Sequence, residues 1–177
     1  TGLIIIEASA ISKEGRIVDS ELGIWKDEHI PQFEKIAENC HKEGASVIVQ
    51  IVHAGMKSVG NPVYSSSNVE MKNKECKEMS LVQIDQVKKD FVNAALRAKK
   101  AGLDGVEIHG AHGYLLSQFT SKEVNQRNDK YGGSLDNRLR LPVEIIKEVR
   151  NAVGEDFIIC YRFGVNDPTF EEDKYFA

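Results

Sequence analysis

Four short runs of apolar, mostly β-branched residues are spread along the chain, and polar sequence separates them. They cover residues 3–8, 46–52, 105–109 and 157–162, and each run carries a polar or small residue toward its C-terminal end. Nearly continuous apolar runs of this length predict strands covered on both faces, which is typical of a parallel sheet.

Between these strands the apolar positions recur with the period of a helix. Residues 27–43 carry an apolar stripe that ends before Gly44, and residues 80–101 begin with Ser80 and Gln83 in the spacing of a capping box. A third helix is predicted over residues 135–153, and we expect Pro142 to lie in a first turn, where proline is tolerated.

The alternation of strands and helices predicts an α/β fold, a partial TIM (β/α)8 barrel of about four consecutive parallel strands with intervening helices. A doubly wound open sheet also fits the alternation. The barrel is favoured because polar residues gather at the C-terminal ends of successive strands, where barrel active sites lie. We expect residues 1–177 to form a single partial barrel domain, truncated at both ends, because a whole barrel needs roughly 250 residues.

The composition narrows the class of protein. The 177 residues include 23 basic and 27 acidic side chains, so the formal charge of −4 offers no basic surface for nucleic acid. Membrane binding is not expected either, since no apolar run approaches the roughly 20 residues of a membrane span, and no signal peptide is visible. Three cysteines without a CxxC motif favour a reducing, cytoplasmic location. The unpaired edges of a half barrel make a homo-oligomer possible.

Two connections, residues 56–79 and 110–134, are long for a compact domain, and both follow the C-terminal end of a predicted strand. Long ordered connections in such places are usually functional. We expect them to form lids over a site.

Side-chain alternation along the strands predicts what lines the inside of the barrel. If His109 points inward, Glu107 does so too and needs a polar partner, while Val106 and Ile108 face the helices. The same alternation puts Gln50 inward on the second strand and Arg162 inward on the fourth. On the first strand it places Ala8 inward together with Ile4 and Ile6.

These inward residues suit a flat heterocycle. Ala8 allows a ring to approach the backbone, the Gln50 amide can pair with ring donors and acceptors, and the Arg162 guanidinium can stabilise negative charge. His112 and Tyr114 follow His109 on a glycine-flanked turn and add hydrogen-bond donors.

The sequence His-Gly-Ala-His-Gly-Tyr at residues 109–114, within the longer run 105–119, resembles the signature of the old yellow enzyme family of FMN-dependent oxidoreductases. Further similar blocks occur in the family's order. They cover residues 2–8, 19–25, 27–29, 50–55 and 125–134, followed by Asn137, Arg138 and Arg162.

The resemblance implies a role for each matching residue. Ala8, Gln50 and Arg162 would contact FMN, with Arg162 stabilising the reduced ring. His109 and His112 would bind the oxygen of an electron-poor small-molecule substrate, and Tyr114 would donate a proton to it. NAD(P)H would be the reductant, and the implied reaction is hydride transfer through the flavin to an activated C=C bond.

Two other hypotheses remain open from the residues alone. The chain could be a non-catalytic half barrel that folds by self-association, or a barrel metallohydrolase. No metal site is expected, because neither a carboxylate nor a third histidine lies at a useful spacing from His109 and His112. We expect His53 to have a structural role, and Arg127, Asp129 and Arg138 to brace loops through ion pairs.

Overall fold

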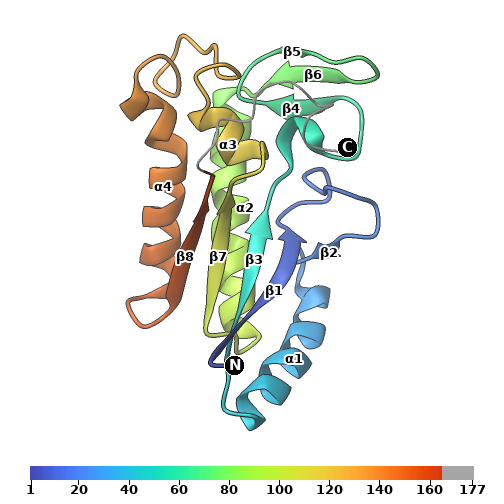
Figure 1. Cartoon of the computed structure of the whole chain (residues 1–177), viewed down its shortest axis with the longest axis vertical. Helices are drawn as coiled ribbons and strands as arrows, with labels where there is room; N and C mark the ends of the chain where they lie inside the picture. Colours follow the sequence, from blue (N-terminus) through green and yellow to red (C-terminus); the bar gives the residue numbers. More distant parts are fainter. Residues whose placement is uncertain (165–177) are drawn as a thin grey trace.

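A five-stranded parallel sheet forms the centre of the computed structural model, which describes residues 1–164 (Figure 1). Its strand order is β2-β1-β3-β7-β8, and every neighbouring pair is parallel. The strands are β1 (Leu3–Ala10), β2 (Leu22–Gly23), β3 (Ser46–Val52), β7 (Gly105–Gly110) and β8 (Ile158–Phe163). The four strands predicted from the sequence are therefore confirmed, and the short β2 is an addition.

Three long helices connect the strands and pack on one side of the sheet: α1 (Ile30–Lys42), α2 (Leu81–Lys100) and α4 (Leu135–Val153). The first helix is preceded by a 3-10 turn, Asp27–His29, because Pro31 occupies a starting position of the α-helix. Ser80 and Gln83 form the predicted capping box. The expectation for Pro142 was wrong, since this residue is buried inside α4, well past its first turn.

The main core lies between the sheet and these helices. Val47, Val49 and Ile51 of β3 are fully buried there, as are Val106 and Ile108 of β7. This confirms the predicted strand faces. Both strands are apolar on the side that the helices cover, so burial fixes their orientation, because a slip of one residue would turn this whole face away from the core.

The predicted face of β1 was partly wrong. Ile4 pairs in register with Val47, and Ile6 pairs with Val49, so both side chains share the helix-facing side of the sheet. The register shifts between Ile6 and Ser9. Simple alternation fails on this strand because such an irregularity inserts an extra residue.

Both long connections contain secondary structure of their own. Residues 56–79 form a second sheet of order β4-β6-β5, made of β4 (Val63–Ser65), β5 (Val69–Glu70) and β6 (Glu75–Glu78). The other connection contains α3 (Leu115–Thr120), and a 3-10 turn, Gly55–Lys57, follows β3. Figure 1 shows the second sheet and α3 beyond the C-terminal ends of the central strands, where the lids were expected.

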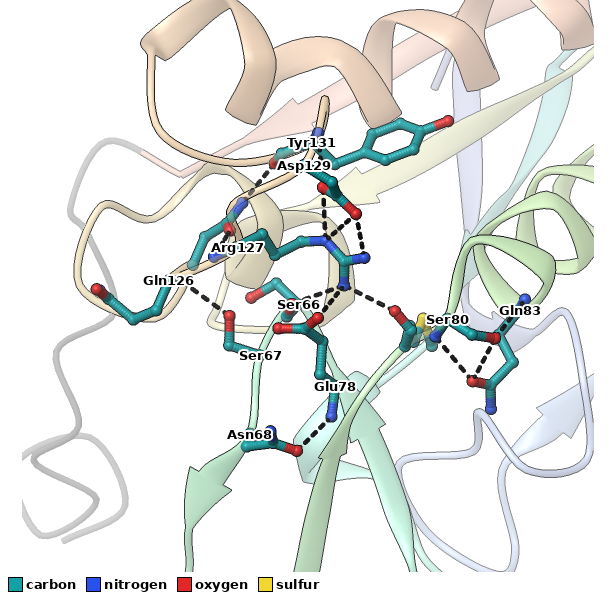
Figure 2. A network of polar contacts seen from close by, with 12 residues as sticks. Ser66, Ser67, Asn68, Glu78, Ser80, Gln83, Gln126, Arg127, Asp129 and Tyr131 are labelled. Carbon is teal, nitrogen blue, oxygen red and sulfur yellow. Dashed lines mark hydrogen bonds and ion pairs between the residues drawn. The ribbon is translucent and has the colours of Figure 1, made fainter.

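Arg127 ties these two connections together (Figure 2). Its side chain is only 3% exposed and binds Asp129 at 2.6 Å, while its Nη1 donates to the carbonyl oxygens of Ser66 and Met79 at 3.0 and 2.7 Å. A buried guanidinium is tolerated only when it is paired in this way. The prediction that Arg127 and Asp129 brace a loop is confirmed.

No helix in residues 1–164 combines the length and the apolar character that a bilayer span requires. The three cysteines, Cys40, Cys76 and Cys160, are all free thiols.

The core predicts a sharp contrast between two positions on α2. Phe91 is fully buried, so Phe91→Ala should lower the free energy of unfolding by about 3–5 kcal/mol through lost burial and a cavity. Val82 is 78% exposed, and Val82→Ala should change the free energy of unfolding by less than about 0.5 kcal/mol. Urea unfolding measures both, and equal losses would contradict the assignment of the core to this helix face.

Candidate functional site

The inward-facing polar residues lie at the C-terminal ends of the central strands. Gln50 on β3 pairs in register with Glu107 on β7, and its Nε2 donates to Glu107 Oε1 at 2.5 Å. This bond gives Glu107 the polar partner that the sequence required. One step further along, His109 on β7 pairs in register with Arg162 on β8. Parallel pairing therefore places Gln50, His109 and Arg162 on the same face of the sheet, near the C-terminal ends of its strands. We call this edge of the sheet the rim.

His109 is a neutral hydrogen-bond donor. Burial, followed by electrostatic interaction with His112 and Arg162, lowers the pKa of His109 to about 4. The backbone N–H of Ala111 donates to His109 Nδ1 at 3.2 Å, so the ring proton resides on Nε2. His109 can thus donate from Nε2 at neutral pH without carrying a charge.

His109, His112 and Tyr114 form a cluster of three rings. The centroid of His109 lies 5.0 Å from those of both His112 and Tyr114, and the last two are 6.4 Å apart. Burial followed by the charge of Arg162 lowers the pKa of His112, whereas burial and the nearby carboxylate of Glu21 raise the pKa of Tyr114. At neutral pH these shifts favour neutral imidazoles and a protonated phenol.

The turn that carries these rings has an uncommon backbone. His112 has φ +58°, the only positive value outside glycine in residues 1–164, and Gly113 follows with φ +68°. Lys57 Nζ donates to the His112 carbonyl at 3.0 Å and lies 5.8 Å from the centre of the Tyr114 ring. Contacts from the loop after β3 therefore help to hold the turn after β7.

Gly110 is needed for a packing reason that the sequence did not reveal. A Cβ at this position would collide with the phenol of Tyr161 on β8. The glycine between His109 and Ala111 therefore leaves room for the Tyr161 side chain against the end of β7.

Ala8 and Arg162 lie where the inward prediction put them. The register shift in β1 leaves Glu7 and Ala8 opposite Gln50, so Ala8 reaches the rim through the irregularity and not through alternation. Arg162 is exposed, yet its charge influences both His109 and His112. His53 is buried, and its Nδ1 accepts the Gly55 N–H over 3.0 Å, which confirms its structural role.

Glu21 is a member of this region to which the sequence analysis gave no role. Its Oε2 accepts the N–H of Ile17, while its Oε1 is buried without a partner. Burial raises the pKa of Glu21 to about 7, against the opposing effects of Ile17 and Arg16. It lies in a matched block, but nothing in the spacing shows that its carboxyl would be buried.

The residues on the rim fit a flat, redox-active heterocycle such as FMN. They offer a small side chain at the Ala8 irregularity, an amide at Gln50, a permanent cation at Arg162 and donors above them. A metal centre has no equivalent set, because residues 1–164 contain no group of three His, Cys, Asp or Glu side chains placed to hold a metal ion.

Half of a parallel β/α barrel, with donor rings and a fixed cation at the C-terminal ends of its strands, has the arrangement of a β/α-barrel enzyme site. Residues 1–176 match the NADH:flavin oxidoreductase / NADH oxidase family. The chain belongs to this family. The resemblance to old yellow enzymes drawn from the sequence is thereby confirmed.

Individual relatives agree with the family match. The chain is 44% identical over 152 residues to an NADPH dehydrogenase of Bacillus subtilis, covering 84% of this chain and 45% of the relative. It is 38% identical over 189 residues to an NADH oxidase of Thermoanaerobacter brockii, covering 99% of this chain and 29% of the relative.

Solved structures confirm the barrel. The Old Yellow Enzyme from Pichia sp. AKU4542 superposes with a TM-score of 0.85 at 37% identity, over 91% of this chain and 46% of that one. A morphinone reductase in complex with tetrahydroNAD superposes with a TM-score of 0.84 at 29% identity, over 90% of this chain and 50% of that one. The chain spans about half the length, or less, of these relatives.

The buried histidines predict that acid destabilises the fold. Both His53 and His109 have a folded pKa of about 4, below the usual 6.5, so the unfolded state binds protons first as the pH falls. The stability they contribute is complete above pH 6.5 and is lost toward pH 4, by up to about 3 kcal/mol per ring. Urea unfolding across this range measures the loss. His109→Gln should reduce this loss of stability. If the free energy of unfolding of the variant fell as steeply with pH as that of the unmodified chain, His109 would not be the buried neutral ring described here.

Glu21 predicts the opposite trend over much of the same pH range. Because its folded pKa of about 7 exceeds the usual 4.5, the folded state retains the proton longer, and stability falls as the pH rises from 4.5 to 7. Glu21→Gln should therefore stabilise the protein more at pH 8 than at pH 5, relative to the unmodified chain. The exposed Glu38→Gln on α1 is the control, and equal effects in the two variants would count against a buried Glu21.

Proposed function

We propose that the chain forms the substrate-binding part of an FMN-dependent oxidoreductase, in which hydride passes from NAD(P)H through the flavin to an activated C=C bond of an electron-poor small molecule. The observation that carries the proposal is the cluster of His109, His112 and Tyr114 beside Gln50 and Arg162, at the strand ends where barrel enzymes bind their ligands. Family membership supports the same chemistry.

FMN, when bound, supplies the two-electron chemistry that amino-acid side chains lack. Gln50 would pair with the heterocycle through its amide, and Ala8 would let the ring lie close to the strand. Arg162 cannot lose its proton at neutral pH, so it would stabilise negative charge on the ring. All three residues lie on the rim of one sheet, which suits a planar ligand.

The substrate's electron-withdrawing oxygen would accept a hydrogen bond from His109 Nε2 and a second one from His112. Negative charge builds on this oxygen when hydride reaches the β-carbon, so fixed donors lower the barrier as an oxyanion hole does. The two histidines donate best as neutral rings held in place, and the Ala111 bond holds His109 in that tautomer.

Tyr114 would complete the reaction. Its phenol carries a proton at neutral pH, and burial together with Glu21 raises its pKa further. The proton would pass to the α-carbon, so that one hydride and one proton together saturate the double bond.

The alternatives have less support. A metallohydrolase would need a donor set that the described part of the chain does not offer. A half barrel that works only by self-association would leave the ring cluster without a use. We further propose a cytoplasmic location. A homo-oligomer is compatible with β8, which forms an edge of the described sheet.

The proposal is tested on the full-length protein that contains this chain, by following the absorbance of its flavin. With FMN bound, anaerobic NADH or NADPH should bleach the flavin absorbance band, and an activated alkene should restore it. Tyr114→Phe should slow alkene reduction about a hundredfold or more, because the general acid is lost. Bleaching by NAD(P)H should remain within about threefold of the unmodified rate, since the phenol takes no part in that step.

Tyr161→Phe is the matched control, because it removes a phenol hydroxyl from the neighbouring strand and leaves the ring cluster intact. It should retain alkene reduction. Full activity in Tyr114→Phe would refute the role of Tyr114, and the absence of flavin binding would refute the proposed function as a whole.

A further inference from the structure

Gln118 on α3 has a buried amide whose contacts join three separate segments. The residue is fully buried. Its Oε1 accepts hydrogen bonds from the Met56 N–H at 3.1 Å and the Ser65 hydroxyl at 2.9 Å. Its Nε2 donates to the carbonyl oxygens of Ala54 at 3.1 Å and Gly113 at 2.7 Å. Two accepted and two donated hydrogen bonds are the full hydrogen-bonding capacity of a side-chain amide.

The surroundings of this amide are shaped to receive it. Gly55 has φ +62°, and a Cβ there would collide with the Gln118 amide. The glycine therefore serves both the turn and the close approach of Gln118. An amide packed against a glycine between two of its own hydrogen-bond partners, Ala54 and Met56, has little freedom to move.

The bond to Gly113 links this arrangement to the ring cluster. Gly113 lies between His112 and Tyr114, and the peptide group it shares with Tyr114 is oriented by the Gln118 bond. His112 and Gly113 both have positive φ, a conformation that a non-glycine residue keeps only when its surroundings enforce it. Lys57 binds the preceding carbonyl at 3.0 Å, and the Leu115 N–H donates to the His53 carbonyl at 3.0 Å.

We infer that Gln118 is a positioning residue, whose amide fixes the turn of His112, Gly113 and Tyr114 against the loop after β3 and so sets where the two rings point. Its importance for catalysis rests on the proposed function, but the positioning itself is a property of the chain alone. None of the four hydrogen bonds of the Gln118 amide goes to the ring of His112 or Tyr114, so the amide acts on these rings through the backbone.

The experiment compares two variants that weaken the same helix in different ways. Gln118→Met keeps the size of the side chain and removes all four amide bonds. Ser66→Ala removes the bond from the Ser66 hydroxyl to the backbone carbonyl of Gln118, 2.8 Å long, and leaves the amide untouched. Both should lower the melting temperature, so a loss of stability does not distinguish positioning from support.

The distinguishing measurement is proton NMR of the chain without cofactor. Gln118→Met should change the ring-proton shifts of His112 and Tyr114 and weaken the nuclear Overhauser contacts among the three rings. Ser66→Ala and the exposed control Gln126→Met should keep the unmodified pattern. The inference would be overturned if Gln118→Met kept the ring-proton shifts and nuclear Overhauser contacts of the unmodified chain, or if Ser66→Ala changed them in the same way as Gln118→Met.

A second measurement on the FMN-bound protein connects positioning with the reaction. Gln118→Met should lower kcat for alkene reduction at least tenfold, while the Kd for FMN changes less than threefold because Gln50 and Arg162 are unaffected. An unchanged kcat would overturn the catalytic importance of the turn. An unmodified protein that neither binds FMN nor reduces alkenes would defeat the proposed function, whereas the NMR result would still decide the positioning role.

Discussion

Burial of one apolar face of β3 and β7 against the helices is the constraint on which the rest of the structure depends. Val47, Val49 and Ile51 fix the register, because a one-residue slip would turn all three away from the core under the helices and put Ile48 and Gln50 there instead. With that face buried, Gln50 and His109 must point the other way. The same hydrophobic contact that stabilises the domain therefore also aims the polar side chains of the site.

A second level of organisation rests on buried polar side chains in the connections. Arg127 joins the small sheet to the segment after α3, and Gln118 joins the turns after β3 and β7. Each has its polar atoms paired, which is what makes its burial tolerable. These two side chains replace the extensive apolar packing that such short strands and a six-residue helix cannot provide.

The electrostatics of the rim favour one kind of chemistry. Arg162 and Lys57 bring positive charge near the rings, and burial keeps His109 neutral. A substrate that gains negative charge would meet a cation and neutral donors, and no carboxylate lies directly in the ring cluster. Glu21 acts on Tyr114 electrostatically, and its effect is to raise the pKa of the phenol.

The sequence by itself determined the parallel α/β architecture, three helices, the strand faces of β3 and β7, and the rim residues Gln50, His109 and Arg162. It could do so because hydrophobic periodicity and strand-end polarity are local signals. Only the tertiary structure decided the register shift that brings Ala8 to the rim, the burial of Glu21, the fit of Tyr161 over Gly110 and the four bonds of Gln118. Each of these depends on contacts between segments far apart in the chain, and no local pattern records such contacts.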